Sequence, residues 1–439
     1  MPPPPTPAVT ASERLIRPAS GRDGEAAPTS AVGPRTAYIL HWFPVPTETF
    51  VFGEVVGLRR LGLPLCVYTL YGERRRNLSR AMREAADRDV ERLGLAGIAR
   101  IAAAIFHWHR RRPRLTRHLL ASALRRRGDG FEKGAENVWA FLAAFALARR
   151  FEAAGIAHIH ASWANGPATA AWAAARLTGI PFTFTARAWD IYPPDGIIAD
   201  KIAAAVFVRS ETAANIRHLV AHAGGDAAKF RLTHNGVPLA PVRLAEAAMR
   251  PPYRLLAVGR FVRKKGFDQL LRALRLLTDA GLDCRLTLAG DGPERGRLHR
   301  LARRLRIAER VAFTGFVPHD SVGELFLASD IFVMPCVVAP SGDRDGIPTV
   351  IMEALQYRLP VVATAVSGIP ELIEDGVTGM LVPERDPTAL AAAIRRLTAD
   401  RDAALALAER GRAAVRQRFD PDTNHRQVFD LYRTVAAPL

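Results

Sequence analysis

Two short segments of the chain combine residue types that bind phosphate groups. In the first, Gly259 and Arg260 follow a strand-like run, and Lys265 and Gly266 precede an amphipathic helical segment. A glycine turn at the carboxyl end of a strand lets the backbone approach a phosphate closely, and the cations neutralise a diphosphate without a metal. Taken alone, the segment also fits a surface turn that binds nothing.

The second segment predicts an anion site at the start of a helix. Pro348 suits the first helical position, and Thr349 and Val350 after it have free backbone N–H groups. Glu353 lies one turn further along, where its carboxylate can reach the hydroxyls of a ligand whose phosphates occupy the helix terminus. Asp345 borders the same site from the preceding loop. The alternatives are an ordinary helix carboxylate for the glutamate and a turn former for the aspartate.

Strand-like and helix-like segments alternate through both halves of the chain. The strand-like runs of the first half are 38–40, 66–70, 158–161, 182–185 and 205–208. The pattern restarts at Tyr253 and continues at 285–290, 311–315, 331–335, 361–364 and 380–382. Such alternation predicts parallel sheets covered by helices on both faces. The expected fold class is therefore α/β, with two Rossmann-like doubly wound domains facing each other across a ligand-binding cleft.

This organisation divides the chain into four parts. Residues 1–35 hold a proline-rich run without the apolar core of a signal peptide, and we expect a disordered tail. We expect the first domain at 36–240 and the second at 252–418. A C-terminal helix at 419–439 is expected to pack back on the first domain.

A basic segment at 97–130 interrupts the first domain. It carries nine arginines and no acid between residues 100 and 127. Apolar residues recur beside these arginines at helical spacing, namely Ile101, Ile105, Trp108, Leu115, Leu119 and Leu120. A basic amphipathic helix pair can lie in a membrane interface, with its cations above anionic headgroups. The alternative is a solvated basic face on helices that pack on the domain.

The whole chain is strongly basic, with 61 Lys and Arg residues against 43 Asp and Glu residues and a formal net charge of +18. This excess indicates an anionic partner or, alternatively, a biased composition, since only five of the cations are lysines. Nucleic acid is disfavoured because interleaved aromatics and a recognition helix are lacking. The apolar stretch 137–148 is too short for a transmembrane helix, and three separate cysteines indicate neither disulfides nor zinc. We therefore expect a cytoplasmic protein.

Several segments, taken together, resemble glycosyltransferase family 4, the retaining enzymes of the GT-B fold. The nucleotide-sugar domain of that family is matched by GRFVRKKGFDQLLRAL, LAGDGPERGRL, FTGFVPHDSV, ASDIFVMPC and DGIPTVIMEALQYRLPVVATAVSGIPELIEDGVTGMLVP. In the first domain, FPVPTETFVFGEV and HIHASWANGPATAAWAAARLTGIPFTFTARAWDIYPPD are similar to the bacterial exopolysaccharide branch, the colanic-acid-type transferases. The resemblance spans most of residues 38–420.

The resemblance implies roles for residues of the second domain. Arg260 and Lys265 match the basic pair that holds the donor diphosphate and stabilises the leaving group. Asp345 and Glu353 match the family's pair of glutamates, the first beside the transferred sugar and the second on the ribose, and the aspartate is one methylene shorter. Further donor-binding positions are implied at Gly259, Gly346, Ile347, Thr349, Val350, Ser367 and Gly368. We expect no metal and no cofactor, although 343–345 has the Asp-x-Asp form of metal-dependent transferases.

In the first domain the resemblance implies an acceptor site. Arg187 stands where family members have a histidine that faces the reacting sugar, so it keeps a donor and adds a fixed charge. Glu48, His160 and Asp190 are assigned to the acceptor side. For His160, at the end of a strand, a structural role is the alternative.

These expectations describe a retaining glycosyltransferase that moves a sugar from a nucleoside diphosphate sugar to a lipid-linked saccharide in exopolysaccharide or cell-surface polysaccharide biosynthesis. Its expected location is the cytoplasm, with peripheral association on the inner face of the cytoplasmic membrane. One alternative is another GT-B activity, a sugar-nucleotide epimerase. The other is a catalytically weak nucleotide-sugar-binding assembly partner of a polysaccharide-synthesis complex, motivated by the departures at Arg187 and Asp345.

Overall fold

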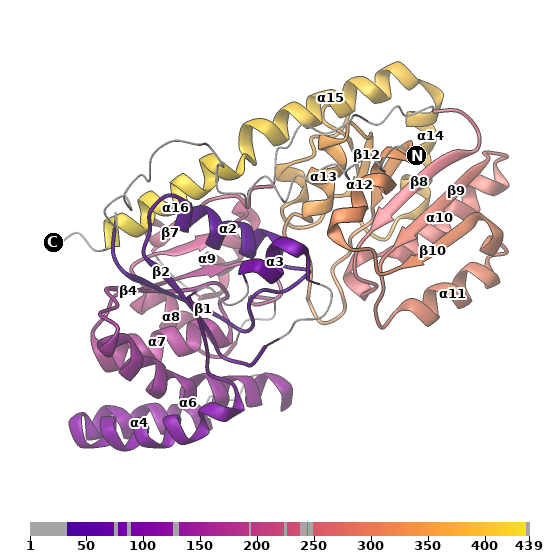
Figure 1. The fold of residues 1–439 in the computed structure, drawn as a ribbon. Coiled ribbons are helices and arrows are strands. Elements are labelled where there is room, and N and C mark those ends of the chain that lie inside the picture. The colour runs from indigo at the N-terminus through magenta and orange to yellow at the C-terminus, as the bar shows by residue number, and fades with distance from the viewer. Residues whose placement is uncertain are drawn as a thin grey trace, which may run out of the picture.

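The computed structural model describes residues 33–73, 78–85, 89–125, 131–192, 195–223, 226–237, 244 and 249–435 of the 439-residue chain. These residues form two α/β domains, and Figure 1 shows them side by side, with the yellow C-terminal helices running along one side of both. Only the last three residues of the tail expected at 1–35 are described, so that expectation lies almost wholly outside the described residues.

The first domain is built on a parallel sheet that has seven strands in the described part of the chain, in the order β3-β2-β1-β4-β5-β6-β7. The strands are β1 (Thr36–Leu40), β2 (Leu65–Thr69), β3 (Val90–Arg92), β4 (His158–Ala161), β5 (Phe182–Ala186), β6 (Val208–Ser210) and β7 (Phe230–Leu232). Its helices include α2 (Thr49–Arg60), α3 (Arg80–Ala85), α7 (Gly166–Thr178), α8 (Ile198–Ala204) and α9 (Ala213–Ala223). All residues of β1, β4 and β5 are buried, as expected for parallel strands covered on both faces.

The second domain repeats this architecture on a smaller parallel sheet, with the described strand order β10-β9-β8-β11-β12-β13. The strands are β8 (Tyr253–Val258), β9 (Cys284–Ala289), β10 (Val311–Gly315), β11 (Ile331–Met334), β12 (Val361–Thr364) and β13 (Met380–Val382). The helices are α10 (Phe267–Asp279), α11 (Arg295–Arg304), α12 (His319–Leu327), α13 (Thr349–Gln356), α14 (Pro387–Ala399) and α15 (Arg401–Arg418). In both sheets the strand order reverses beside the first strand of the domain, between β1 and β4 and between β8 and β11. In folds of this kind, ligands bind at the carboxyl ends of the strands on either side of such a reversal.

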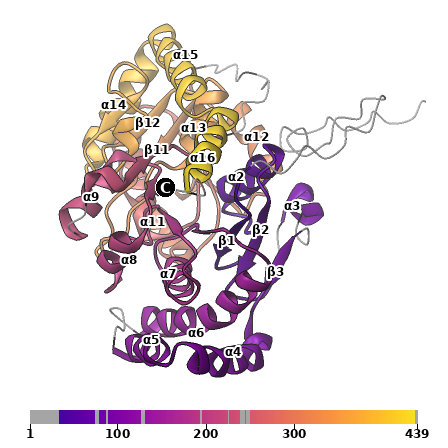
Figure 2. The ribbon, with the colours of Figure 1, turned by 90° about the vertical axis from the view of Figure 1, so that its left-hand side faces the viewer.

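The basic insertion forms α4 (Ile98–Arg111) and α5 (Pro113–Arg125), and α6 (Phe131–Ala153) follows it. Figure 2 shows these helices at the end of the first domain, far from α14 and α15. Trp108 is fully buried, and its indole donates a hydrogen bond to the carbonyl oxygen of Phe145 at 3.2 Å. Ile101 and Leu119 are buried in the same core cluster. The apolar stripe that was expected to face a membrane therefore packs inside the domain, because it is buried against apolar residues of α6. That part of the prediction was wrong.

The chain returns to the first domain through α16 (Pro421–Val435), which packs on α2. Val428, Phe429 and Tyr432 of this helix share a core cluster with Tyr38 of β1 and with apolar residues of α2. Figure 1 shows α15 over the second domain and α16 over the first. The C-terminal segment thus ties the two domains together. Among the described helices, none combines the length and the hydrophobicity of a membrane span.

Candidate functional site

The cationic turn after β8 packs closely against the loop after β11. Lys265 ends a short 3-10 helix, η3 (Arg263–Lys265), and Gly266 follows it with a φ of 62°. A Cβ atom at this glycine would overlap the carbonyl oxygen of Pro335, so both the left-handed backbone and the close approach require glycine. Val337 donates its backbone N–H to the carbonyl oxygen of Lys264 at 2.8 Å. This packing fixes the two lysines beside the loop that leads into α13.

Asp345 in that loop forms ion pairs with both lysines. Its carboxylate lies 2.8 Å from Nζ of Lys265 and 3.3 Å from Nζ of Lys264, which also lies 3.0 Å from Asp343. Burial opposes the charge of Asp345, yet the two lysines hold the pKa of that carboxyl well below its usual range. Burial alone would lower the pKa of Lys265, and the Asp345 carboxylate reverses this and raises it. Both groups are therefore charged at neutral pH, and the aspartate predicted beside the sugar is held against the cations.

Arg260 and Gly259 lie at the entrance to this turn. Arg260 is exposed, and its charge acts on Lys265 in the direction that lowers the pKa of the lysine. A Cβ atom on Gly259 would come within 3.3 Å of Cε of Lys265, so the glycine backbone borders the lysine side chain. The structure thus brings the predicted basic pair together at one end of β8.

Glu353 projects from α13 toward α12 of the same domain. Its carboxylate lies 3.5 Å from Nε2 of His319, and this hydrogen bond raises the pKa of the histidine above its ordinary value. Pro348 is the N-cap of α13 and not its first helical residue as predicted. Thr349 and Val350 then begin the helix with their backbone N–H groups unpaired within it, as at any helix start. Ile347 is buried in the core, so only its backbone can contribute to a ligand site.

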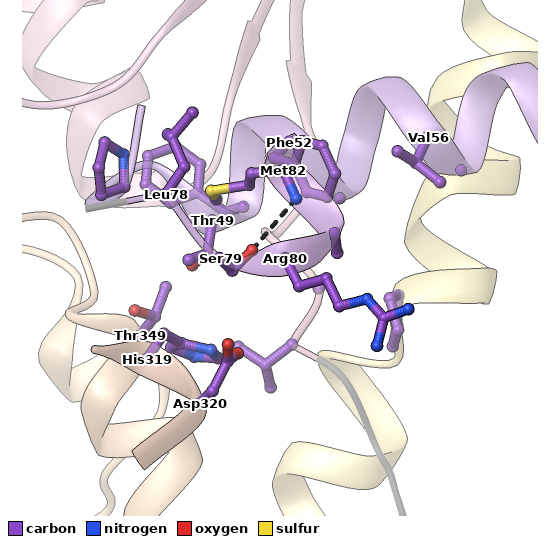
Figure 3. Close-up of a pocket in the computed structure, with 18 of the residues that line it drawn as sticks. Thr49, Phe52, Val56, Leu78, Ser79, Arg80, Met82, His319, Asp320 and Thr349 are labelled. Atoms are coloured by element: carbon purple, nitrogen blue, oxygen red, sulfur yellow. Dashed lines mark hydrogen bonds between the residues drawn. The ribbon is translucent and has the colours of Figure 1, made fainter. Parts of the chain in front are cut away.

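A cavity of about 450 Å³ lies between the two domains beside Glu353. On the side of the second domain it is lined by Phe316, Pro318, His319, Asp320, Thr349 and Glu353. On the side of the first domain, Thr49, Phe52, Val56, Leu78 and Met82 of α2 and the α3 region face them. Figure 3 shows the labelled side chains of the two domains pointing toward one another across this space. Both sides of the cavity are mixed, since Arg60, Ser79 and Arg80 of the first domain also line it and Phe316 and Pro318 belong to the second. Such a mixture of polar and apolar groups suits a ligand that has both hydroxyls and a flat ring.

The small residues after β11 and β12 lie where the domains touch. A Cβ atom on Gly346 would come within 3.2 Å of Oε1 of Glu211, and one on Gly368 would overlap the side chain of Thr212. Ser367 precedes Gly368 with a left-handed φ of 54°. Glu371, in η5 (Ile369–Glu371), accepts the backbone N–H groups of Ala213 and Ala214 at 2.9 Å each. The loop predicted to bind donor phosphates therefore also holds the start of α9.

Arg187 lies in the interior of the first domain, with 1% of its side chain exposed. Its guanidinium donates hydrogen bonds to Glu211 at 2.8 Å and to Asn235 at 3.0 Å, and a third Nε–H bond goes to the carbonyl oxygen of Ser162. A residue that contacts the sugar was expected to face the cleft, but the Arg187 side chain does not face open space. The reason is that carboxylates distant in the sequence neutralise it within the domain.

The three residues assigned to the acceptor side lie in different surroundings. His160 is fully buried between Thr183 and Thr185, at 2.8 and 3.1 Å, and burial lowers its pKa well below the ordinary value. Asp190 is buried and accepts the backbone N–H groups of Ala164 and Arg187, so it ties two strand ends together.

Both side chains are buried and hydrogen-bonded inside the domain, so their assignment to the acceptor side stays a prediction. Burial raises the pKa of Asp190 to about 6, and its carboxylate lies inside the domain. Glu48, in contrast, is the partly exposed N-cap of α2, next to the cavity-lining Thr49.

Three residues at the cleft were missed from the sequence. Glu211 and Thr212 follow β6 directly and contact the glycines of the other domain, while His319 begins α12 beside Glu353. The sequence offered one signal for them. Glu211 and Thr212 come directly after a strand, and His319 follows a Phe-Val-Pro loop at the end of another strand, where ligand-binding residues of such folds lie.

Comparisons with known proteins find similarity to glycosyltransferases. Residues 246–414 match the family described as Glycosyl transferases group 1. The chain is 33% identical over 221 residues to the amylovoran biosynthesis glycosyltransferase AmsK of Erwinia amylovora, covering 50% of this chain and 54% of that protein. It is 30% identical over 255 residues to the GDP-mannose-dependent alpha-(1-6)-phosphatidylinositol monomannoside mannosyltransferase of Mycobacterium tuberculosis, covering 56% of this chain and 66% of that protein.

The chain spans about half the length of several curated relatives that it matches. Among solved structures, Anabaena Alr3699/HepE in complex with UDP and glucose superposes with a TM-score of 0.66 at 18% identity, covering 92% of this chain and all of that chain. Two parallel-sheet domains, the cleft between them and this likeness define a GT-B fold, whose second domain resembles the group 1 glycosyl transferases over residues 246–414.

Proposed function

We propose that the chain is a retaining glycosyltransferase of the family 4 type, which moves a sugar from a nucleoside diphosphate sugar to a saccharide acceptor in polysaccharide biosynthesis. The observation that carries this proposal is that a charged Lys265 is paired with Asp345 in the loop that leads into α13, the helix that also carries Glu353 beside the cavity. The names of the relatives support it, since AmsK acts in amylovoran biosynthesis and the mycobacterial protein depends on GDP-mannose. The UDP and glucose in the HepE complex support the donor class.

In this proposal the donor lies along the edge of the second domain. The nucleoside occupies the cavity beside Glu353, which accepts the ribose hydroxyls. The diphosphate lies against Arg260, Lys265 and the N–H groups at the start of α13. These groups stabilise the negative charge that develops on the leaving diphosphate, and the acceptor hydroxyl attacks the sugar from the same face.

The proposed donor site works without a divalent metal. Asp343 and Asp345, the two acids of the Asp-x-Asp triplet, are both paired with lysines at 2.8 to 3.3 Å. These carboxylates are engaged with lysines and not left to bind a metal, and in this proposal the exposed Arg260 and the N–H groups at the start of α13 supply, with Lys265, the positive charge that a metal would bring to the diphosphate.

Calorimetry with UDP and GDP tests this donor site. At least one of the two should bind the wild type equally in EDTA and in magnesium, and Lys265→Ala should weaken that binding at least tenfold. Arg263→Ala is the matched control, because Arg263 lies in the same turn but pairs with Glu294. Loss of binding in EDTA, or equal binding by Lys265→Ala, would contradict the proposal.

A lipid-linked acceptor and a peripheral position on an anionic membrane are the finer part of the proposal. The phosphatidylinositol in the name of the mycobacterial relative supports a lipid acceptor. The outward face of α4 remains exposed after its apolar stripe is buried, with Phe106 63% exposed and the guanidinium of Arg110 5.6 Å from its ring. An aromatic ring beside a cation is the kind of group that enters a headgroup region.

Vesicle sedimentation tests the membrane part. Each arginine near an anionic surface contributes about 1 kcal/mol, so Arg110→Gln should weaken partition onto phosphatidylglycerol vesicles about fivefold. Arg111→Gln is the control, because Arg111 pairs with Glu152 at 2.8 Å. Equal partition by wild type and Arg110→Gln, or partition that does not change with salt, would contradict a membrane role for this face.

A second candidate function is that of a nucleotide-sugar-binding assembly partner with little catalysis of its own. The observation that favours it is that Arg187 and Asp345 are engaged in ion pairs within the protein. This candidate predicts binding of a nucleotide sugar without release of the nucleoside diphosphate. The same calorimetry, followed by a coupled assay of diphosphate release, separates the two functions.

A further inference from the structure

Aromatic side chains follow neighbouring strands of the first sheet at their carboxyl ends. In the order β2-β1-β4-β5, the residues that come just after the strands are Tyr71, then His41 and Trp42, then Trp163, then Trp189. Trp139 of α6, the helix that follows the basic insertion, joins them. Because the carboxyl ends of parallel strands meet at one edge, these rings gather at the edge of the first domain that faces ligands in folds of this kind. We call these six residues the aromatic track.

The rings of the aromatic track form a continuous series. The centroids of Trp163 and Trp189 are 5.5 Å apart, and that of Trp189 is 5.8 Å from His41. Trp42 lies 5.9 Å from His41 and stacks on Tyr71 at 4.6 Å. Tyr71 then lies 6.4 Å from Trp139, nearly parallel to it.

Polar contacts hold the track in place and add a carboxylate to it. The indole of Trp139 donates to the carbonyl oxygen of Leu70 at 2.9 Å. Glu136 lies 3.0 Å from Nε2 of His41 and accepts the N–H of Gly166 at 2.9 Å. Burial opposes the charge of Glu136, but its bond with His41 lowers the pKa of the carboxyl. The track therefore carries a charged acceptor of hydrogen bonds among its rings.

Four of the six rings of the track reach the surface. Trp189 is 40% exposed, and Trp42, Tyr71 and Trp139 are partly exposed, whereas His41 and Trp163 are buried and connect them from below. Four exposed or partly exposed aromatic rings, gathered at the carboxyl ends of neighbouring strands and on the helix beside them, favour a ligand with matching apolar faces. Sugar rings have such faces, made of C–H groups, and hydroxyls around them that a carboxylate binds.

We propose that the aromatic track binds the saccharide part of the acceptor, with sugar rings stacked on its aromatic faces and Glu136 accepting a hydroxyl. This inference rests on the proposed function and assigns its acceptor to a surface. Phe50 links the track to the donor side, because it lines the cavity and its ring is 6.2 Å from that of Trp163. The other end reaches α6, the helix that follows the basic insertion. A saccharide chain would thus run from the reacting sugar toward the insertion.

The test uses a printed glycan array, probed with the labelled full-length protein in the presence of UDP. Trp189→Ala and Trp42→Ala should each raise the concentration needed for half-maximal glycan signal at least tenfold. Trp189→Phe, which keeps an aromatic face, should stay within about threefold of the wild type. Leu276→Ala truncates an exposed apolar side chain on α10, far from the track in the sequence, and serves as the control. Thermal unfolding of every variant checks that the fold is retained.

The outcomes separate this inference from the proposed function. Equal glycan binding by the wild type and both alanine variants would overturn the inference, as would a wild type that binds no glycan on the array. Loss of binding that Trp189→Phe shares with Trp189→Ala would also count against stacking. Nucleotide binding is followed by calorimetry on the same samples, and its absence in the wild type would overturn the proposed function instead.

Discussion

The guanidinium of Arg187 lies near the carboxylates of Glu54 and Glu211, at 3.9 and 2.8 Å. Removal of one partner from a buried ionic cluster leaves the remaining charges uncompensated and costs about 3–5 kcal/mol. We therefore expect Arg187→Ala to lower the free energy of unfolding by about that amount, as measured by urea denaturation. Arg285→Ala, on an exposed strand position, should change it little. A stable Arg187→Ala protein with only altered kinetics would show that the arginine acts on substrate and not on the fold.

The pair of His319 and Glu353 predicts a pH dependence. The hydrogen bond to Glu353 raises the pKa of His319 above 6.5, so the pair stabilises the fold fully below pH 6.5 and this contribution is lost as pH rises through the raised pKa. NMR titration should find the His319 pKa above 6.5 in the wild type and lower in Glu353→Gln. The stability difference between the two proteins should shrink as pH rises from 6 to 8. An unchanged His319 pKa in the variant would contradict the pairing.

At the scale of elements, Glu371 connects a loop of one domain to a helix of the other. Its carboxylate accepts the N–H groups of Ala213 and Ala214 at the start of α9, a capping interaction of about 1 kcal/mol. Glu371→Ala should therefore speed hydrogen exchange at these two amides about fivefold. Glu374→Ala, a neighbouring exposed acid, is the control. Exchange that is unchanged in Glu371→Ala would show that the domains do not hold this contact in solution.

The strands that position the site could be predicted from their apolar runs, which are buried on both faces in β4 and β12, while β10 is an edge strand with exposed and half-buried residues in alternation. The runs at 158–161, 311–315 and 361–364 coincide with β4, β10 and β12. The short strands β3 (Val90–Arg92) and β7 (Phe230–Leu232) were missed, since three residues with charged members show no pattern. The run predicted at 205–208 meets β6 only at Val208, because its apolar residues begin in the preceding turn.

At the scale of the whole molecule, the cationic turn and the start of α13 could be assigned from the sequence because each is a local motif. The surroundings of Arg187, His160 and Asp190 could not be predicted. Their hydrogen-bond partners lie on or after other strands, and the sequence alone does not show which of these residues are close in space. The stripe around Trp108 was open to two interpretations for the same reason. An amphipathic pattern predicts that the apolar face of a helix is buried but not what buries it. The fold shows that α6 covers the apolar face around Trp108.

The central claim is that the domain edge at Lys265 binds a nucleoside diphosphate sugar and releases its diphosphate. The direct measurement is a coupled assay of diphosphate release from a panel of UDP- and GDP-sugars, run in EDTA with wild type, Lys265→Ala and Arg263→Ala. The account predicts release from at least one donor by the wild type and Arg263→Ala, and at least tenfold slower release by Lys265→Ala. No release from any donor, or equal release by Lys265→Ala, would contradict it.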